Sequence, residues 1–235
     1  MLSFRFVIGV ICFMSITVNS QEINQFDNDN KRHGVWRKTF KGTNQVRYEG
    51  QFEHGRETGE FKFYKLYNNK SVLSATKLFH DKTSQVAVKF YTSRGKLISE
   101  GSMIGKIHIG KWIYYHKNSS KIMTSETYDN RGLLQGDQLV YYDNGELAEK
   151  TYFLNGKKEG VSEIFSLKGV VLKHLNYAND TLHGLSKSYN GKGELLSEGQ
   201  FKKGKKTGVW LYYNNNKLIN KKDFTYYSKF QKPKK

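Results

Sequence analysis

Cysteine and proline are almost absent from this chain of 235 residues, which holds one of each. Cys12 lies in an apolar N-terminal run, so the rest of the chain has no thiol for disulfides, thiol catalysis or cysteine-based zinc sites. Pro233 is near the C-terminus, which leaves the preceding backbone N–H groups free to join β-ladders. Stability must therefore come from packing and hydrogen bonds.

Long hydrophobic runs are also missing, apart from residues 6–18. That run is shorter than the roughly 20 residues that a membrane-spanning helix needs. It follows the basic start Met1–Arg5 and precedes small residues that end at Ser20. This layout predicts a signal peptide over residues 1–20 with cleavage after Ser20, the alternative being an uncleaved anchor. We expect a secreted, periplasmic or envelope protein whose mature chain has no transmembrane span.

Catalytic and metal-binding motifs are not apparent. The sequence has no H-x-x-x-H pair, CxxC, Walker loop or G-x-S-x-G elbow. Its seven histidines are distributed along the chain, and residues one repeat unit apart in a stacked sheet are separated by about 10 Å. Metal ligands lie about 2 Å from their ion. We therefore expect no enzyme activity, no catalytic residue, no cofactor and no metal site.

A sequence unit of 24 to 26 residues repeats along most of the chain. Each unit closes on a glycine and continues into an aromatic pair, such as Tyr141-Tyr142, and an Asn-Gly-type turn, such as Asn144-Gly145. A period of this length indicates a repeat architecture, and alternating runs joined by such turns predict β-hairpins. The closing glycines are Gly34, Gly59, Gly110, Gly136, Gly160, Gly184 and Gly208, with the unit near Ser84 lacking its glycine.

These units predict an all-β fold: a single-layer curved antiparallel sheet of about eight tandem hairpins and some 16 strands. The array is expected over residues 34–224, after a polar leader at 21–33 and before a basic tail at 225–235. The second tyrosine of each aromatic pair can belong either to the core or to a binding groove. The positions expected to be structural in every unit are Trp36, Trp112, Trp210, Gly110, Gly136, Gly160, Gly184 and Gly208.

The repeat resembles the MORN-repeat family in its bacterial variant form. The matching residues run from Gly136 through Tyr141-Tyr142-Asp143-Asn144-Gly145-Glu146-Leu147 to Tyr152, Asn155-Gly156-Lys157 and Gly160. The resemblance implies a hairpin array with a protein–protein interaction or scaffolding role and no reaction. Many bacterial members are labelled YwqK-type antitoxin, which adds a neutralising, immunity-type role as a more distant expectation.

Positive charge is in large excess, with 39 Lys and Arg against 21 Asp and Glu. Such a field attracts anionic partners, although lysines at strand edges also keep a long sheet soluble. The leading expectation for the partner is another protein, and the alternative is an anionic glycan or lipid head group; secretion disfavours nucleic acid. The candidate surface for an anionic partner is Lys157, Lys158, Lys202, Lys203, Lys205 and Lys206.

Glutamate recurs two or three residues before the large apolar residue that ends the return strand in most units, with His174 and Lys221 in its place elsewhere. A residue that recurs in most units is expected to make the same hydrogen bond or ion pair each time. We therefore predict a structural ladder in which glutamates face adjacent lysines such as Lys150. The recurring residues are Glu49, Glu100, Glu126, Glu149 and Glu198.

Overall fold

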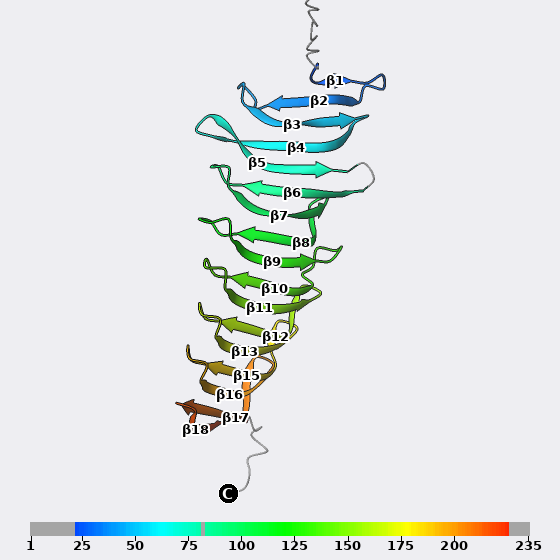
Figure 1. Ribbon diagram of the computed structural model, residues 1–235. Helices are drawn as coiled ribbons and strands as arrows, with labels where there is room; N and C mark the ends of the chain where they lie inside the picture. Colours follow the sequence, from blue (N-terminus) through cyan, green and yellow to red (C-terminus); the bar gives the residue numbers. More distant parts are fainter. Residues whose placement is uncertain (1–21, 81–82, 226–235) are drawn as a thin grey trace, which may run out of the picture.

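The protein is a single open antiparallel sheet (Figure 1). The computed structural model describes residues 22–80 and 83–225, and within them there are eighteen strands and no helix, so no helix that could cross a membrane occurs there. The strands are β1 (Gln25–Phe26), β2 (Arg32–Thr39), β3 (Val46–Glu53), β4 (Arg56–Tyr67), β5 (Lys70–Phe79), β6 (Gln85–Tyr91), β7 (Leu97–Ile104), β8 (Ile107–Tyr115), β9 (Ile122–Tyr128), β10 (Gly136–Tyr141), β11 (Leu147–Leu154), β12 (Lys157–Phe165), β13 (Val171–Ala178), β14 (Thr181–Leu182), β15 (Gly184–Tyr189), β16 (Leu195–Lys202), β17 (Lys205–Asn214) and β18 (Lys217–Asp223).

The connectivity is a meander in which each strand pairs with the next one in the chain. Only β14 departs from this rule, because β13 pairs both with this two-residue strand and with β15. Figure 1 shows the resulting ladder of hairpins, with turns alternating between the two long edges of the sheet. The predicted fold class, an all-β sheet of tandem hairpins, is confirmed.

The ordered array begins earlier than the sequence predicts. Residues 21–33 were expected to form a polar leader, but β1 lies within them and pairs with β2 through Gln25–His33 and Phe26–Arg32. The Phe26 ring packs edge-on against Trp36, with 5.1 Å between centroids, which covers the first unit. The predicted signal peptide, and all of the basic tail except Thr225, lie outside the described residues.

The unit glycines occupy a backbone conformation that other residues rarely adopt. Gly110 has a φ of 62°, and the ladder between β7 and β8 shifts register at this point. A positive φ costs glycine little because it has no Cβ. The same conformation is found at the other expected structural glycines: Gly136 at 83°, Gly160 at 68°, Gly184 at 95° and Gly208 at 61°.

The two faces of the sheet differ in composition. Side chains alternate between them along each strand, so Trp112 and Tyr114 share one face while Ile113 lies on the other. We call the first the aromatic face, since it carries most of the buried rings. We call the second the charged face, since ionic side chains run across it. In the described residues the largest side chains that are fully buried on the aromatic face are Trp112, Phe52, Phe61 and Val88, and Trp210 is nearly so.

Packing on the aromatic face depends on a glycine opposite a large ring. Trp112 lies over Gly101, and a Cβ added there would be 2.4 Å from the indole. Trp210 covers Gly199 in the same way, at 2.3 Å. Both indole N–H groups donate to backbone carbonyls of the neighbouring strand, at 2.9 and 3.1 Å. Trp36 occupies the equivalent slot but is only half-buried, because it lies in the first full-length strand.

One return strand presents a different side chain from the one the repeat suggests. Tyr152 fits the position of the return-strand aromatic, yet it is 38% exposed on the charged face, opposite Asp137. Phe153 takes its place, buried on the aromatic face opposite Gly136. A displacement of one residue reverses the face because strand side chains alternate with a period of two.

Candidate functional site

A continuous row of paired residues crosses the charged face from β2 to β18. It begins with Arg37 opposite Glu49 and ends with Leu211 opposite Lys221, with each member directly opposite the next. Opposite charges in direct cross-strand positions stabilise a sheet modestly. The row is Arg37, Glu49, Lys62, Thr76, Lys89, Glu100, Ile113, Ser125, Leu139, Lys150, Glu163, His174, Lys187, Glu198, Leu211 and Lys221.

Three glutamates of this row each contact one cation of the row and one tyrosine outside it. In the first group, Glu49 accepts a hydrogen bond from the Tyr64 hydroxyl at 2.6 Å and forms an ion pair with Arg37 at 3.1 Å. The others are Lys89–Glu100–Tyr115 and Lys187–Glu198–Tyr213, with tyrosine–glutamate distances of 2.5 and 2.8 Å. The second tyrosine of the aromatic pair therefore has a structural partner in these three units.

These contacts shift the ionisation of their members in opposite directions. Burial together with the bond to Glu49 raises the pKa of Tyr64 to about 12. The bond to Glu100 together with burial raises the pKa of Tyr115 to about 12. The tyrosine hydroxyls in turn lower the pKa of Glu49 and of Glu198. The contacts thus favour the neutral phenol and the ionised carboxylate. This fits the structural role predicted for the recurring glutamates.

Two of the five recurring glutamates lie on the opposite face. Glu126 is buried on the aromatic face, where the Tyr128 hydroxyl donates to it at 2.5 Å and the Gln138 amide at 2.7 Å. Glu149 is also on that face and accepts from the Thr151 hydroxyl at 2.8 Å. The prediction of one common ladder is therefore wrong for these two. Lys150 is directly opposite Glu163, but its ion pair is with Asp137 at 3.0 Å, and Asp137 is not one of the recurring acidic residues.

The six lysines proposed for an anionic partner do not form one surface. Lys206 lies on the aromatic face, where its ammonium group is 3.9 Å from the Trp210 ring and 3.2 Å from the Tyr212 hydroxyl. Lys158 likewise faces Tyr177 at 5.3 Å and Glu149 at 3.9 Å. Lys157, Lys202, Lys203 and Lys205 are exposed, in two separate hairpins. The structure thus divides the set into two side chains held by aromatic rings and four exposed ones.

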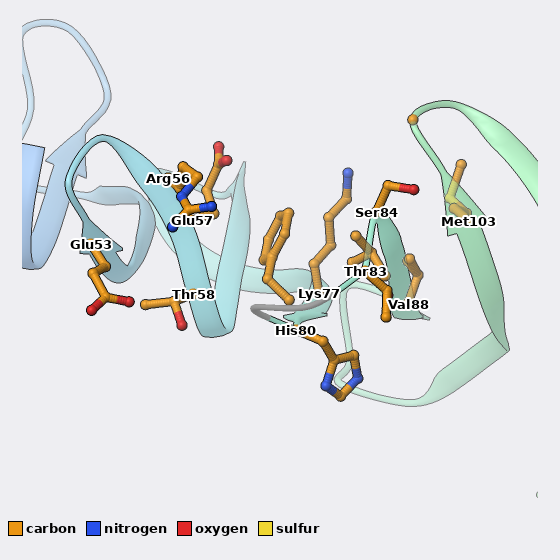
Figure 2. A pocket seen from close by; sticks show the side chains of 13 residues that line it. Glu53, Arg56, Glu57, Thr58, Lys77, His80, Thr83, Ser84, Val88 and Met103 are labelled. Atoms are coloured by element: carbon orange, nitrogen blue, oxygen red, sulfur yellow. The ribbon is translucent and has the colours of Figure 1, made fainter.

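A hollow opens on the aromatic face between β4 and β7, within the eroded units of the repeat (Figure 2). Its volume is about 520 Å³. Apolar side chains from three strands line it together with charged and hydroxyl groups, with Glu53, Arg56 and Glu57 toward one end and Val88 and Met103 toward the other (Figure 2). The apolar lining is Phe79, Val86, Val88 and Met103, and the polar lining includes Glu53, Arg56, Glu57, Lys77, His80, Thr83 and Ser84.

The hollow lies where this unit lacks the large ring that Trp36, Phe61, Trp112 and Trp210 supply in four other units. Val88 occupies the position that Phe61 and Trp112 hold in neighbouring units, and Lys77 lies opposite it in place of a glycine. The ladder between β5 and β6 also runs without a register shift, since no unit glycine is present near Ser84. A valine fills much less volume than an indole, so the surface sinks here. Erosion of the repeat was visible in the sequence, but the hollow was not.

Comparison with known proteins gives no family. No family model matches the chain, and no curated protein matches it. A solved structure of a mutant of S. aureus TarM, in complex with Fondaparinux, alpha-GlcNAc-glycerol and UDP, resembles it with a TM-score of 0.31 and 16% sequence identity. That similarity covers 43% of this chain and 19% of the TarM chain. A score this low carries no argument about fold or function.

A second hollow, of about 750 Å³, is lined by cationic groups at the edge formed by the β6–β7 and β8–β9 turns. Lys65, Arg94, Lys96 and Lys117 line it, and none of its lining residues is acidic. The Lys96 ammonium group donates to the Lys117 carbonyl at 3.2 Å, which ties the two turns together. None of these four residues was among the predicted lysines, because residues from separate units converge here only in the folded sheet.

One group of metal-ligand side chains also comes together within residues 22–80 and 83–225. Asp27, His33 and His54 each place one ligand atom within 4.8 Å of the others. The distance argument against a metal site applies to histidines a full unit apart. That argument fails for His33 and His54, since they belong to the same unit and their ring centroids are 5.0 Å apart.

Proposed function

We propose that this protein is a non-catalytic, secreted or envelope binding protein of the MORN-variant type that captures a polypeptide partner in the hollow between β4 and β7. The observation that supports this most directly is that apolar side chains line the hollow beside charged and hydroxyl groups, which we call its rim. Pockets that recognise ligands are commonly apolar inside with a few polar groups that fix orientation. The rim carries both signs of charge, as at Glu57 and Arg56, which suits a polypeptide better than a polyanion.

The partner we expect presents one large apolar side chain to Val88 and Met103, with polar backbone or side chains at the rim. Other units without a ring have a polar side chain in its place, such as Ser162, which is buried and lies 2.7 Å from the Thr151 hydroxyl. Beside Val88, by contrast, the lining is apolar and open to a protruding residue. The hollow is lined by described residues of five strands, β3 to β7, and of turns between them, so its shape depends on the array rather than on one loop.

Site-specific photocrosslinking tests this proposal. A benzoyl-phenylalanine at Ser84, on the rim, should give a protein adduct of one defined mass in envelope fractions of the source cells. The same residue at Ser120, an exposed position in the β8–β9 turn, is the matched control and should give none. The Ser84 adduct should persist at high salt and disappear when Met103 is replaced by Glu. Equal labelling from both positions would overturn the proposal, as would a tagged chain found wholly in the cytoplasm.

A second candidate function rests on the cationic hollow at the β6–β7 and β8–β9 turns. Four cations without an acidic neighbour would favour sulfated or carboxylated glycans or anionic lipid head groups. Binding to heparin or to phosphatidylglycerol vesicles should then fall several-fold in Arg94→Gln but not in Lys217→Gln, which changes an exposed lysine at the start of β18, outside the hollow. It should also weaken steeply with salt. Equal loss in both variants would indicate a diffuse charge effect and would exclude this second function.

A further inference from the structure

We propose that Asp27, His33 and His54 form a binding site for a divalent transition-metal ion of the Zn²⁺ type. The group is independent of both hollows described above. It lies where the β1–β2 hairpin meets the turn between β3 and β4. Each ligand comes from a different segment, and one ligand atom from each lies within 4.8 Å of the other two.

The backbone holds these three segments together. His33 pairs with Gln25 in the ladder between β1 and β2. His54 has a φ of 46° in the turn before Gly55, whose N–H donates to the Arg32 carbonyl at 2.8 Å. The two imidazole rings are brought to 5.0 Å between centroids. The ligand set thus rests on ladder and turn hydrogen bonds rather than on free loops.

The carboxylate is oriented before any ion binds. One oxygen, Oδ1, accepts hydrogen bonds from the backbone N–H groups of Asp29 and Lys31, at 3.0 and 2.8 Å. The other, Oδ2, is 2.7 Å from Nδ1 of His54 and points at the histidine pair. Oriented carboxylates with a second set of hydrogen bonds are typical of metal ligands. Ligands about 2.0 to 2.2 Å from a Zn²⁺ ion lie roughly 3.3 Å apart, which small rotations of the two exposed imidazoles would give.

A later unit contains the same loop with a different set of side chains. There Asp129 accepts from the N–H groups of Arg131 and Leu133, both at 2.9 Å, as Asp27 does from Asp29 and Lys31. The N–H of Gly156 donates to Leu134 at 2.8 Å, as Gly55 does to Arg32. Gln135 then stands where His33 is, and Asn155, with a φ of 51°, stands where His54 is.

The difference between the two loops is a cation. In the later unit the Arg131 guanidinium bridges Asp129 at 2.7 Å and Asn155 at 2.6 Å. The corresponding residue of the first unit is Asp29, which pairs with Lys31 at 3.3 Å, so that loop keeps its carboxylate at Asp27, loses the arginine and gains two imidazoles. A bound metal ion would supply the positive charge that Arg131 supplies in the later loop. The side chains of the first loop thus differ from those of the later loop in a way that favours binding of a metal ion.

The donor set indicates which ions to expect. Two imidazole nitrogens and one carboxylate oxygen suit Zn²⁺, Cu²⁺, Ni²⁺ and Co²⁺ better than Ca²⁺ or Mg²⁺, which prefer oxygen ligands. Three protein ligands leave a coordination position for water or for a side chain of a partner. The loop is exposed, so such a partner could reach the ion.

Titration of the untagged, chelator-treated full chain with ZnCl₂ and CoCl₂ tests the site. A histidine tag must be absent because it would bind the same ions. We expect one saturable Zn²⁺ site by calorimetry, no response to MgCl₂, and visible absorption bands from bound Co²⁺.

The variants are taken from the later loop, which already accommodates the replacement residues. His33→Gln combined with His54→Asn should lower Zn²⁺ affinity by a factor of ten or more, with an unchanged circular dichroism spectrum and unfolding midpoint. His183→Ala, which removes a single histidine preceding Gly184, should leave affinity unchanged. Absence of saturable Zn²⁺ uptake, or equal uptake by the double variant, would overturn the proposal.

Discussion

Trp112 lies flat against the backbone of Gly101 on the neighbouring strand, where any Cβ would come within 2.4 Å of the indole ring. The same relationship joins Trp210 to Gly199 and Phe61 to Gly50. Each pair is eleven residues apart, so the spacing is a property of the hairpin. In these three units the core of the one-layer sheet is built from rings that lie over glycines, whereas a buried hydroxyl pair, Thr151 and Ser162, takes the equivalent place in a middle unit.

Replacing Gly101 by Ala should destabilise the protein by about 1 to 3 kcal/mol, because an extra methyl group in a filled site forces its neighbours to move. Gly199→Ala should behave in the same way. The matched control is Gly191→Ala, where a Cβ meets nothing within 4 Å and φ is not positive. Urea unfolding followed by tryptophan fluorescence measures the difference. Equal stability of Gly101→Ala and Gly191→Ala would contradict the packing described.

The free energy of unfolding should fall between about pH 10 and 12, as the part-buried phenols of Tyr64 and Tyr115 ionise. Both phenols have a pKa of about 12 in the folded chain, against about 10 when unfolded. A raised pKa means that the contribution is complete below pH 10 and is lost as the pH rises through 12. Lysine deprotonation occurs in the same range, so the comparison is with a Tyr64→Phe, Tyr115→Phe double variant at each pH. A pH-independent difference between the two proteins would exclude this role.

At acid pH the protein should lose stability because Glu198 becomes protonated, in contrast to the loss at alkaline pH through the tyrosines. The bond from the Tyr213 hydroxyl lowers the pKa of this carboxyl, with Lys187 adding to the effect. Its contribution is therefore complete above the unfolded pKa of 4.5 and is lost as the pH falls through the lowered folded value. Glu198→Gln should lose stability at pH 7 but show a flatter decline below pH 4.5. Glu60→Gln, at an exposed position on the same face, should follow the wild-type pH profile.

Neighbouring lysines in one hairpin should respond differently to the same substitution. Lys206→Gln should lower stability by on the order of 1 kcal/mol, because its ammonium group lies 3.9 Å from the Trp210 ring. Lys205→Gln removes the same charge from an exposed side chain and should change stability little. Thermal unfolding of the two variants distinguishes these outcomes. If both lysines serve only to keep the protein soluble, the two variants will unfold at the same temperature.

The assignment of side chains to faces could be predicted where the repeat is regular and not where it shifts. Trp112 and Tyr114 share one face, as alternation along one regular strand requires of residues two apart. Tyr152 and Glu126 lie on the faces opposite to those expected, because a displacement of one residue or a bulge reverses the alternation. Such shifts depend on the partner strand as well as on the local sequence.

The sequence by itself determined the period, the antiparallel hairpin array and the glycines at positive φ, because these follow from local turn chemistry and strand alternation. It also indicated where the repeat erodes. Only the tertiary structure decided which side chains from separate strands meet, since that depends on the register between strands. The register between strands places a hollow beside Val88, where a ring is missing, and places Lys206 on the aromatic face. It also brings Asp27, His33 and His54 close together.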